Sequence, residues 1–361
     1  MKIITILGAR PQFIKAAVVS REIRKKYEEV IVHTGQHYDY NMSEVFFEEL
    51  KIPRPHYNLG VNGGNHGKMT GEMLIKIEEV LLQEKPHLVI VYGDTNSTLA
   101  GALAAVKLHI PVCHIEAGVR LGTLHNPEEV NRIVTDHVSN LLLCCTKSGV
   151  GFLEKEGIKA QIALIGDPMY DAFNYYSNSL NNISRTLTGI EEKAITIPDK
   201  YYYLTCHRPE NTDNKEALLE ILKAADSLDS ICIYPVHPRN KEAVTTLKKE
   251  YGFNNIYLCE PVSYMTSIYL LLHCKKVITD SGGLQREAFF AKKQCITVFN
   301  QVIWPETMIN NRNQLANAKE NDILEKLALE QSLAGCEEPF GDGNSAKKIV
   351  IAIEDFFSRK V

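Results

Sequence analysis

The sequence predicts an α/β protein made of two Rossmann-like, doubly wound domains that face a central cleft. Short runs of β-branched and apolar residues alternate with helix-length amphipathic segments along the whole chain. This alternation is typical of parallel sheets covered by helices on both faces. The chain has 361 residues, of which 45% are hydrophobic, and this length is sufficient for two buried cores.

The predicted strands form two series separated by a polar stretch. The first series lies at residues 3–7, 30–33, 88–92, 112–115, 141–144 and 162–165, and the second at 202–206, 231–234, 256–258, 277–279 and 296–299. The stretch 175–200 between them is rich in Asn and Ser and shows no clear strand. We therefore expect one domain over 1–170, a second over 171–342, and a C-terminal helix within 343–361 that packs back on the first domain.

Charge and composition exclude several classes of partner. The formal net charge of −4 gives no basic field that would recruit nucleic acid or an anionic membrane. The first residues, MKIITILGAR, hold too short an apolar run for a signal peptide, and no 18-residue apolar stretch follows. The nine cysteines have no metal-site spacing, and most lie in or beside strand-like runs. We expect a cytoplasmic protein whose cysteines are buried thiols, with no metal.

Cations follow the first predicted strand, at the edge where doubly wound sheets bind ligands. The strand leads into Gly8 and Arg10, and Lys15 stands one helical turn further on. Gly8 is the only glycine here, so the G-x-G-x-x-G fingerprint of NAD binding is missing. Pro11 suits the first turn of a helix, which makes Arg10 and Lys15 a candidate diphosphate clamp at a helix N-terminus. An ordinary helix with solvated charges explains them equally well.

Three carboxylates from separate elements are predicted to lie at this same edge of the first sheet. Asp94 and Glu116 each end a buried strand, and Glu128 opens a helix that also carries Arg132. An unpaired carboxylate at the end of a buried strand is costly, which favours a functional role for Glu116. Acids at helix starts commonly complement the helix dipole, and we favour that interpretation for Glu129.

The second series of strands is followed by residues that suit a nucleotide. His207 stands at a strand end rather than on an apolar helix face, which favours function, whereas the role of His237 is open. The run Ser281-Gly282-Gly283 lies at a predicted helix start, where glycines let phosphate oxygens approach backbone N–H groups. Glu287, one turn into that helix, is placed to accept hydrogen bonds from both ribose hydroxyls.

Eight motifs together resemble those of the non-hydrolysing UDP-N-acetylglucosamine 2-epimerases. They are GARPQFIKA, TGQH, GDTNSTLAGALAA, HIEAG, PEEVNR, HRPEN, VHPR and DSGGLQREA, in this order across roughly residues 1–295. The resemblance implies the GT-B-like fold of many nucleotide-sugar glycosyltransferases, a UDP-sugar substrate and a homodimer. The HGKMTG stretch and the short spacing from HIEAG to PEEVNR are more similar to the branch acting on UDP-2,3-diacetamido-2,3-dideoxy-glucuronate.

By motif position, the resemblance also implies residue roles. The implied catalytic residues are Arg10, Lys15, Asp94, Glu116, Glu128, Arg132 and His207. The implied substrate- and UDP-binding residues are Arg10, His37, His207, Arg208, Glu210, His237, Ser281, Gly282, Gly283 and Glu287. The chain departs from the family pattern at 120–126, at 299–303 and again at 310–318, close to where the sugar and diphosphate would bind.

The implied reaction inverts C2 of the sugar, as a step toward surface polysaccharide precursors. Because the C2 proton is not next to a carbonyl, simple removal and return is prohibitive. Elimination of UDP to a 2-acetamidoglycal, followed by re-addition, needs carboxylates on both faces and positive charge at the diphosphate. No cofactor is expected. Alternatives are a GT-B glycosyltransferase, a non-catalytic UDP-sugar binder, and an enzyme that hydrolyses the intermediate.

Overall fold

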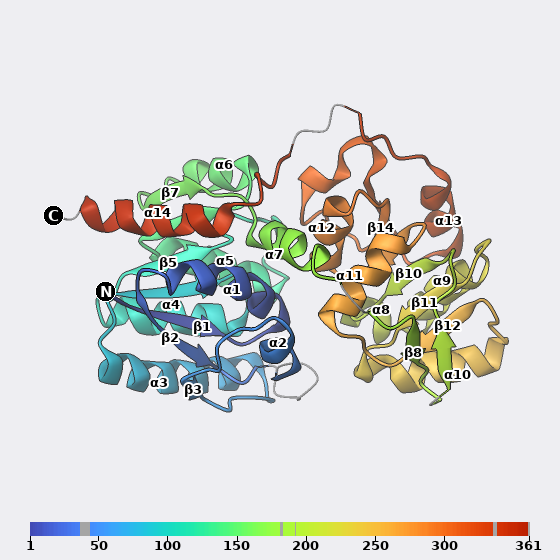
Figure 1. Cartoon of the computed structure of the whole chain (residues 1–361), viewed down its shortest axis with the longest axis horizontal. Helices are drawn as coiled ribbons and strands as arrows, with labels where there is room; N and C mark the ends of the chain where they lie inside the picture. Colours follow the sequence, from blue (N-terminus) through green and yellow to red (C-terminus); the bar gives the residue numbers. More distant parts are fainter. Residues whose placement is uncertain (37–43, 181–182, 192, 335–337, 360–361) are drawn as a thin grey trace. The chain divides into compact units, whose positions relative to one another are not determined.

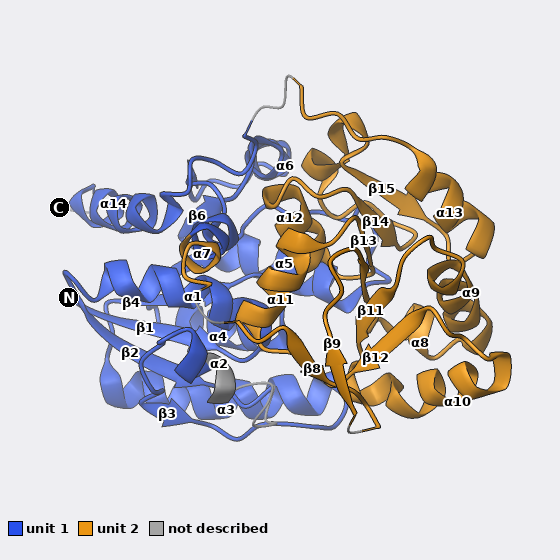
Figure 2. Cartoon of the chain, turned by 45° about the vertical axis from the view of Figure 1, so that its right-hand side comes forward, with its two compact units in different colours: residues 1–174, 338–361 blue, residues 175–337 orange. Residues whose placement is uncertain are grey.

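The structure is a computed structural model that describes residues 1–36, 44–180, 183–191, 193–334 and 338–359 (Figure 1). The chain forms two compact units, one of residues 1–174 with 338–361 and one of residues 175–337 (Figure 2). Both termini belong to the first unit. No described helix is long and apolar enough to span a membrane.

The first unit is built on a seven-stranded parallel sheet in the order β3-β2-β1-β4-β5-β6-β7. Its strands are β1 (Lys2–Leu7), β2 (Glu28–His33), β3 (Tyr57–Asn58), β4 (Leu88–Tyr92), β5 (Val112–Ile115), β6 (Leu141–Cys144) and β7 (Gln161–Leu164). Its helices are α1 (Arg10–Ile23), α2 (Glu44–Glu49), α3 (His66–Glu84), α4 (Asn96–Lys107), α5 (Pro127–Val138), α6 (Lys147–Lys155), α14 (Ser345–Ser358) and the first part of α7 (Pro168–Ser177). The strand order reverses between β1 and β4, which is the switch point where such sheets bind ligands.

Local sequence explains how tightly this unit packs. All five residues of β4 are buried, because helices cover both faces of the sheet. Helix α4 is capped by Thr95, whose side chain accepts a hydrogen bond from the backbone N–H of Thr98. Gly101 lets α4 approach β1 closely, since a Cβ there would lie 2.8 Å from the side chain of Ile6. The switch point is therefore held between a fully buried strand and a tightly packed helix.

The C-terminal helix α14 joins the first unit from the far end of the chain. Its stripe of Ile349, Ile353 and Phe356 is buried, and the helix contacts α1 (Figure 1). Such a stripe at helical spacing has to be covered by another element. Residues separated by more than 300 positions thus share one core.

The second unit has a six-stranded parallel sheet in the order β12-β11-β10-β13-β14-β15. Its strands are β10 (Tyr202–Thr205), β11 (Cys232–Pro235), β12 (Ile256–Cys259), β13 (Val277–Thr279), β14 (Cys295–Val298) and β15 (Asn313–Ala316). Its helices are α8 (Pro209–Thr212), α9 (Lys215–Asp226), η2 (Pro238–Asn240), α10 (Lys241–Tyr251), α11 (Tyr264–His273), α12 (Gly282–Phe290), η3 (Pro305–Asn311) and α13 (Glu320–Ala328). The switch point lies between β10 and β13.

The stretch 175–200, expected to contain no strand, holds a small antiparallel pair. β8 (Thr186–Thr188) pairs with β9 (Ala194–Thr196), and Gly189 bridges to Cys259 of β12. Three-residue strands are too short for an alternating pattern to stand out, and only Leu187 of β8 is buried. The expectation was wrong because tertiary contact, not local pattern, stabilises this pair.

Candidate active site

The turn after β4 carries Asp94, which is bound by a buried arginine. A short hydrogen bond joins Arg132 Nη2 of α5 to Asp94 Oδ2, and Arg132 Nη1 lies 3.0 Å from Glu129 Oε2. Burial opposes the charge on Arg132, but the carboxylates of Asp94 and Glu129 together raise its pKa above the ordinary value. Arg132 is therefore a fixed cation that orients Asp94.

The residue after β5, Glu116, forms a buried ion pair. Its Oε2 lies 2.6 Å from Lys15 Nζ, and the two side chains are only 8% and 3% exposed. Glu116 has a φ of 73°, in the left-handed region that non-glycine residues rarely adopt. Such strain is concentrated at functional sites. Helix α1 and the turn after β5 thus bring together two residues that are 101 positions apart in the sequence.

Helix α1 and the loops around it are tied to the same edge. Gln12 accepts hydrogen bonds from the N–H groups of Gly8 (2.7 Å) and Ala9 (3.0 Å) and donates to the carbonyl of Tyr92 (2.8 Å). Arg10, the first residue of α1, is half-buried. Gln12 therefore holds the Arg10 loop against the turn that carries Asp94.

Glu128 differs from the two other carboxylates because its side chain is exposed, in the first turn of α5. Asn126 caps this helix by accepting from the N–H groups of Glu128 and Glu129. The structure therefore gathers Lys15, Asp94, Glu116 and Arg132 in contacting pairs and leaves Glu128 at the surface of the unit. His37, expected to bind substrate, lies outside the described residues.

In the second unit, Asp280 organises the loop after β10. It follows β13, is 1% exposed, and accepts hydrogen bonds from the backbone N–H groups of His207 and Arg208 at 2.9–3.1 Å. Its Oδ1 also lies 3.1 Å from His207 Nδ1, and Asn211 Nδ2 donates to it at 3.2 Å. The guanidinium of Arg208 lies over the ring of Phe299, 4.1 Å from its centroid. His207 and Arg208 are thus fixed in place by one buried carboxylate.

The N-terminus of α12 has the features of an anion cradle. Ser281 caps the helix by accepting from the N–H of Leu284, and Gly282 and Gly283 form its first turn. A Cβ at Gly283 would meet nothing nearer than Ser281 Oγ at 3.6 Å, so the backbone there is open to a ligand. Glu287 is buried one turn further along the same helix.

The two histidines of the second unit lie near each other. The ring centroids of His207 and His237 are 6.3 Å apart. His237 caps η2 by accepting a hydrogen bond from the N–H of Arg239, which restrains its ring. Glu210 is exposed in the short helix α8. The carboxyl edge of this sheet therefore gathers His207, Arg208, His237 and the α12 cradle around its switch point.

Comparison with known proteins identifies the family of the chain. The sequence profile described as UDP-N-acetylglucosamine 2-epimerase matches residues 21–354. The chain belongs to the UDP-N-acetylglucosamine 2-epimerase family. The family, the GT-B-like two-unit α/β fold and the isomerase class predicted from the motifs are confirmed.

Among the relatives of this epimerase is a UDP-N-acetylglucosamine 2-epimerase homolog of Methanococcus maripaludis, 47% identical over 97% of the chain and 98% of the relative. The UDP-2,3-diacetamido-2,3-dideoxy-D-glucuronate 2-epimerase of Pseudomonas aeruginosa is 43% identical over 97% of the chain and 98% of its own length. The crystal structure of the Methanocaldococcus jannaschii UDP-GlcNAc 2-epimerase with UDP-GlcNAc and UDP is similar with a TM-score of 0.86. That similarity has 36% identity and covers 98% of this chain and 100% of the other.

Glu129 of this epimerase differs from the dipole complement expected from the sequence. It is 1% exposed, and its Oε1 accepts hydrogen bonds from the N–H groups of Leu121 (2.7 Å) and Gly122 (3.0 Å). Its other oxygen binds Arg132. The expectation was wrong because the loop before α5 folds back over the helix and buries this side chain. The i,i+3 spacing from Glu129 to Arg132 was the available signal.

Within the described part of the epimerase, one group of side chains has the spacing of a metal site. Ligand atoms of Glu116, Cys145 and Asp167 lie within 4.8 Å of one another. The ammonium of Lys15 already neutralises Glu116 at 2.6 Å, which disfavours a divalent cation at the same oxygens. We therefore assign these side chains to the ion-pair environment of Glu116.

Asp280 is expected to make this epimerase less stable as the pH falls into the acid range. Burial favours the protonated carboxyl, but the hydrogen bond and charge of His207 outweigh it and lower the pKa of Asp280 to about 2. Because the folded pKa lies below the unfolded value, this stabilisation is present above about pH 4 and is lost as the pH falls toward 2. We expect the free energy of unfolding to fall by about 2 kcal/mol across this pH range.

Urea unfolding between pH 5 and pH 2 measures this loss. Asp280→Asn should flatten the pH dependence, and Asp213→Asn, at an exposed aspartate that pairs with Arg239, is the matched control. An Asp280→Asn protein with the full wild-type pH dependence would show that another carboxylate is responsible.

Proposed function

We propose that this protein epimerises UDP-N-acetylglucosamine at C2, giving UDP-N-acetylmannosamine, through elimination and re-addition of UDP. The observation that carries the proposal is a pair of carboxylate–cation contacts at one edge of the first unit's sheet. The Lys15–Glu116 pair is buried, and in the Arg132–Asp94 pair the Asp94 side chain is 26% exposed. Carboxylates held in position by neighbouring groups are among the side chains that perform general acid–base catalysis. The family and the UDP-GlcNAc complex of the Methanocaldococcus jannaschii relative support the same substrate.

In the first half of the proposed reaction, a carboxylate removes the C2 proton. The electrons of the C2–H bond form the C1=C2 double bond, and those of the C1–O bond leave with UDP. In the second half, a diphosphate oxygen of UDP attacks C1 and a carboxylic acid delivers a proton to the opposite face of C2. The net change is inversion at C2 with no oxidant consumed.

We assign the acid and base roles to Asp94, Glu116 and Glu128, without allocating them between the two faces. Arg10, Lys15 and Arg132, together with His207, stabilise the charge of the departing diphosphate. Each preorganised donor of this kind is worth about 3 kcal/mol in the barrier. Lys15 and Arg132 already hold the carboxylates, which supports a shared electrostatic role for cation and acid.

We place the UDP on the second unit. The open N-terminus of α12, with Ser281, Gly282 and Gly283, suits the diphosphate, because helix N-termini favour anions. Glu287 suits the ribose hydroxyls, and His207, His237 and Arg208 suit the phosphates. Glu210 and His37 complete the proposed binding set by motif position.

A second candidate substrate is UDP-2,3-diacetamido-2,3-dideoxy-glucuronate. The relative from Pseudomonas aeruginosa that is named for this substrate is 43% identical to the chain. The HGKMTG stretch, which begins α3, also favours this branch, and His66 of α3 contacts Asn96 beside the Asp94 turn. The same elimination chemistry would apply.

The proposed reaction is tested by NMR in deuterated water with each UDP-sugar supplied separately. We expect deuterium to appear at C2 while UDP remains attached, and the better substrate to exchange faster. Transfer of the sugar to an acceptor without C2 exchange would identify a glycosyltransferase. Release of free UDP with an epimerised sugar would identify hydrolysis, and tight binding with no exchange would identify a UDP-sugar binder.

We also propose a homodimer in the cytoplasm that serves surface polysaccharide synthesis. The family resemblance supports the dimer, which light scattering would check. The eight cysteines of the described ranges are buried, and the pKa of the Cys113 thiol is raised by burial, as suits unreactive thiols in a reducing compartment.

A further inference from the structure

Four side chains of the first unit form a continuous ion-pair chain that the proposed reaction does not yet use. They run from Glu156, after α6, through Arg120 and Asp136 to His114 at the end of β5. Arg120 binds Glu156 through two hydrogen bonds of 2.7 and 2.8 Å and binds Asp136 at 2.7 Å. We call these four residues the relay. The side chains of Asp136 and His114 are wholly buried.

Both ring nitrogens of His114 lie within hydrogen-bond distance of an oxygen atom. Its Nδ1 lies 2.7 Å from Asp136 Oδ1, and its Nε2 lies 2.7 Å from the carbonyl oxygen of Gly93. A carbonyl oxygen can only accept, so Nε2 must carry a proton. Asp136 Oδ2 already accepts from Arg120 and from the N–H of Gly118, which keeps the carboxylate ionised and makes it an acceptor for Nδ1. A proton on each ring nitrogen satisfies both contacts together.

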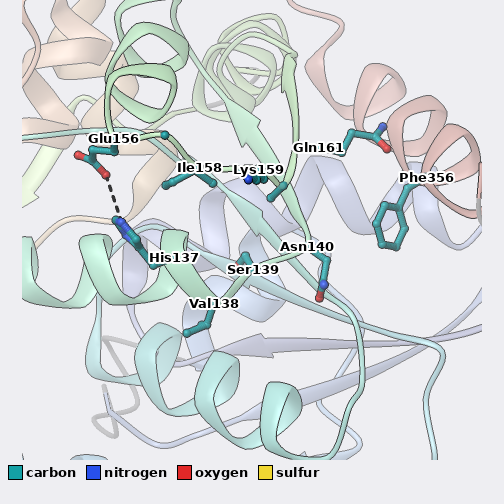
Figure 3. A pocket seen from close by; sticks show the side chains of 11 residues that line it. His137, Val138, Ser139, Asn140, Glu156, Ile158, Lys159, Gln161 and Phe356 are labelled. Carbon is teal, nitrogen blue, oxygen red and sulfur yellow. Dashed lines mark ion pairs between the residues drawn. The ribbon is translucent and has the colours of Figure 1, made fainter.

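The relay balances this buried charge. Burial acts to raise the pKa of Asp136, but His114 and then Arg120 outweigh it, and the pKa stays below the ordinary value. Two cations and two anions alternate along the chain of contacts, so no charge is left uncompensated. The outer member, Glu156, lines an open pocket of about 570 Å³, 3.9 Å from His137 Nε2 (Figure 3).

The inner end of the relay holds the two turns that carry the proposed acids. His114 donates to the carbonyl of Gly93, the residue before Asp94, and Asp136 accepts from Gly118, two residues after Glu116. Glu116 has a φ of 73°, which a non-glycine residue holds only under tertiary restraint, whereas Gly93 adopts its φ of 62° without steric cost. His114 and Asp136 supply this restraint.

We propose that His114, held as an imidazolium by Asp136, is a positioning residue for the turns that carry Asp94 and Glu116. This inference rests on the proposed function, because those two carboxylates are its acid and base candidates. His114 would act through them and touch no substrate. Loss of its charge would let the turns shift without removing any reacting group.

The charge of the ring is read directly by NMR. In protein with ¹⁵N-labelled histidine, both His114 nitrogens should show the chemical shifts of protonated imidazolium nitrogens at pH 8. His114→Gln identifies the resonances by their loss, and the exposed His137 is the internal comparison. Ionisable groups around the ring include Asp136 and Arg120, with Cys144 beside Asp136 and the Lys15–Glu116 pair beside Gly93. A neutral ring with one unprotonated nitrogen would overturn the proposal.

Enzyme kinetics test the proposed positioning role of His114. Asp136→Asn keeps the size of the side chain and removes its charge. We expect kcat for C2 exchange to fall on the order of 100-fold, because misplacement near 1 Å costs about that much, with KM within about threefold. Arg120→Gln, a second variant should Asp136→Asn not fold, is expected to lower kcat about tenfold by the same misplacement. Lys159→Ala, in the same pocket but outside the relay, is the control and should keep wild-type values.

The NMR and kinetic experiments together distinguish a failure of this inference from a failure of the proposed function. The ring spectra, and the shift of the Gly118 amide in Asp136→Asn, are recorded without substrate. A wild-type protein that shows no C2 exchange contradicts the function, while an imidazolium and a displaced Gly118 amide would still uphold the relay. A folded Asp136→Asn protein with kcat within twofold of wild type would overturn the positioning role.

Discussion

Replacing Glu116 with Gln is expected to lower kcat for C2 exchange by about 10²- to 10⁴-fold, the contribution of a general acid or base. The same change removes the carboxylate that lies 2.6 Å from the buried Lys15 ammonium. Removing one member of a buried ion pair leaves the other charge uncompensated and lowers the free energy of unfolding by about 3–5 kcal/mol. The variant should therefore lose both activity and stability, through two different physical causes.

A double variant separates these two causes. Lys15→Met alone should destabilise the protein as strongly as Glu116→Gln, because it leaves a buried carboxylate. Combining both changes removes both charges and should recover most of the lost stability in urea unfolding. It should recover no C2 exchange, since a proposed acid or base is missing. Wild-type exchange by folded Glu116→Gln protein would remove Glu116 from the proposed chemistry.

Replacing Gly118 with Ala is expected to be among the most damaging changes to the fold of the first unit. Gly118 has a φ of 79°, and a Cβ there would lie 2.3 Å from the carbonyl oxygen of Gly149 and 2.7 Å from its carbonyl carbon. Because both atoms belong to the backbone of α6, no side chain can move aside. We expect a loss of about 4 kcal/mol, made up of overpacking and left-handed strain.

Gly122→Ala is the matched control for this prediction. Gly122 has a similar φ of 75°, but a Cβ there would meet nothing within 4 Å. Gly122→Ala should lower the free energy of unfolding by only about 1 kcal/mol, because it adds left-handed strain and no close contact. Urea unfolding of both variants measures the difference. Equal losses would show that the backbone conformation, and not contact with Gly149, sets the cost.

The sequence predicted the central strands well because their physical signal is local. Residues 88–92, 112–115, 141–144 and 277–279 were predicted with the bounds that the structure has. Each is a short, mainly apolar run, as is typical of a strand covered on both faces. The two-residue β3, the pair β8 and β9 and the edge strand β15 carry weaker patterns, and these strands were not predicted.

In the candidate site, likewise, some features were predicted from the sequence and others depend on the fold. Asp94 and Glu116 were placed at one sheet edge, because parallel strands that end in polar residues bring those residues to a common side. The partners of these carboxylates depend on which helices pack at that edge, and periodicity carries no information about that. The exposure of Glu128 and the burial of Glu129, its neighbour in the chain, likewise follow from the fold of one loop.

The sequence by itself determined the α/β class, the family motifs and the strand ends that carry the candidate residues, since hydrophobic period and motif order are properties of neighbouring residues. Only the tertiary structure decided that Lys15 neutralises Glu116, that Arg132 binds Asp94 and that His114 lies between Asp136 and the carbonyl of Gly93. Charges in a protein interior are set by desolvation and by partners distant in sequence. Those partners meet only when the sheet has assembled.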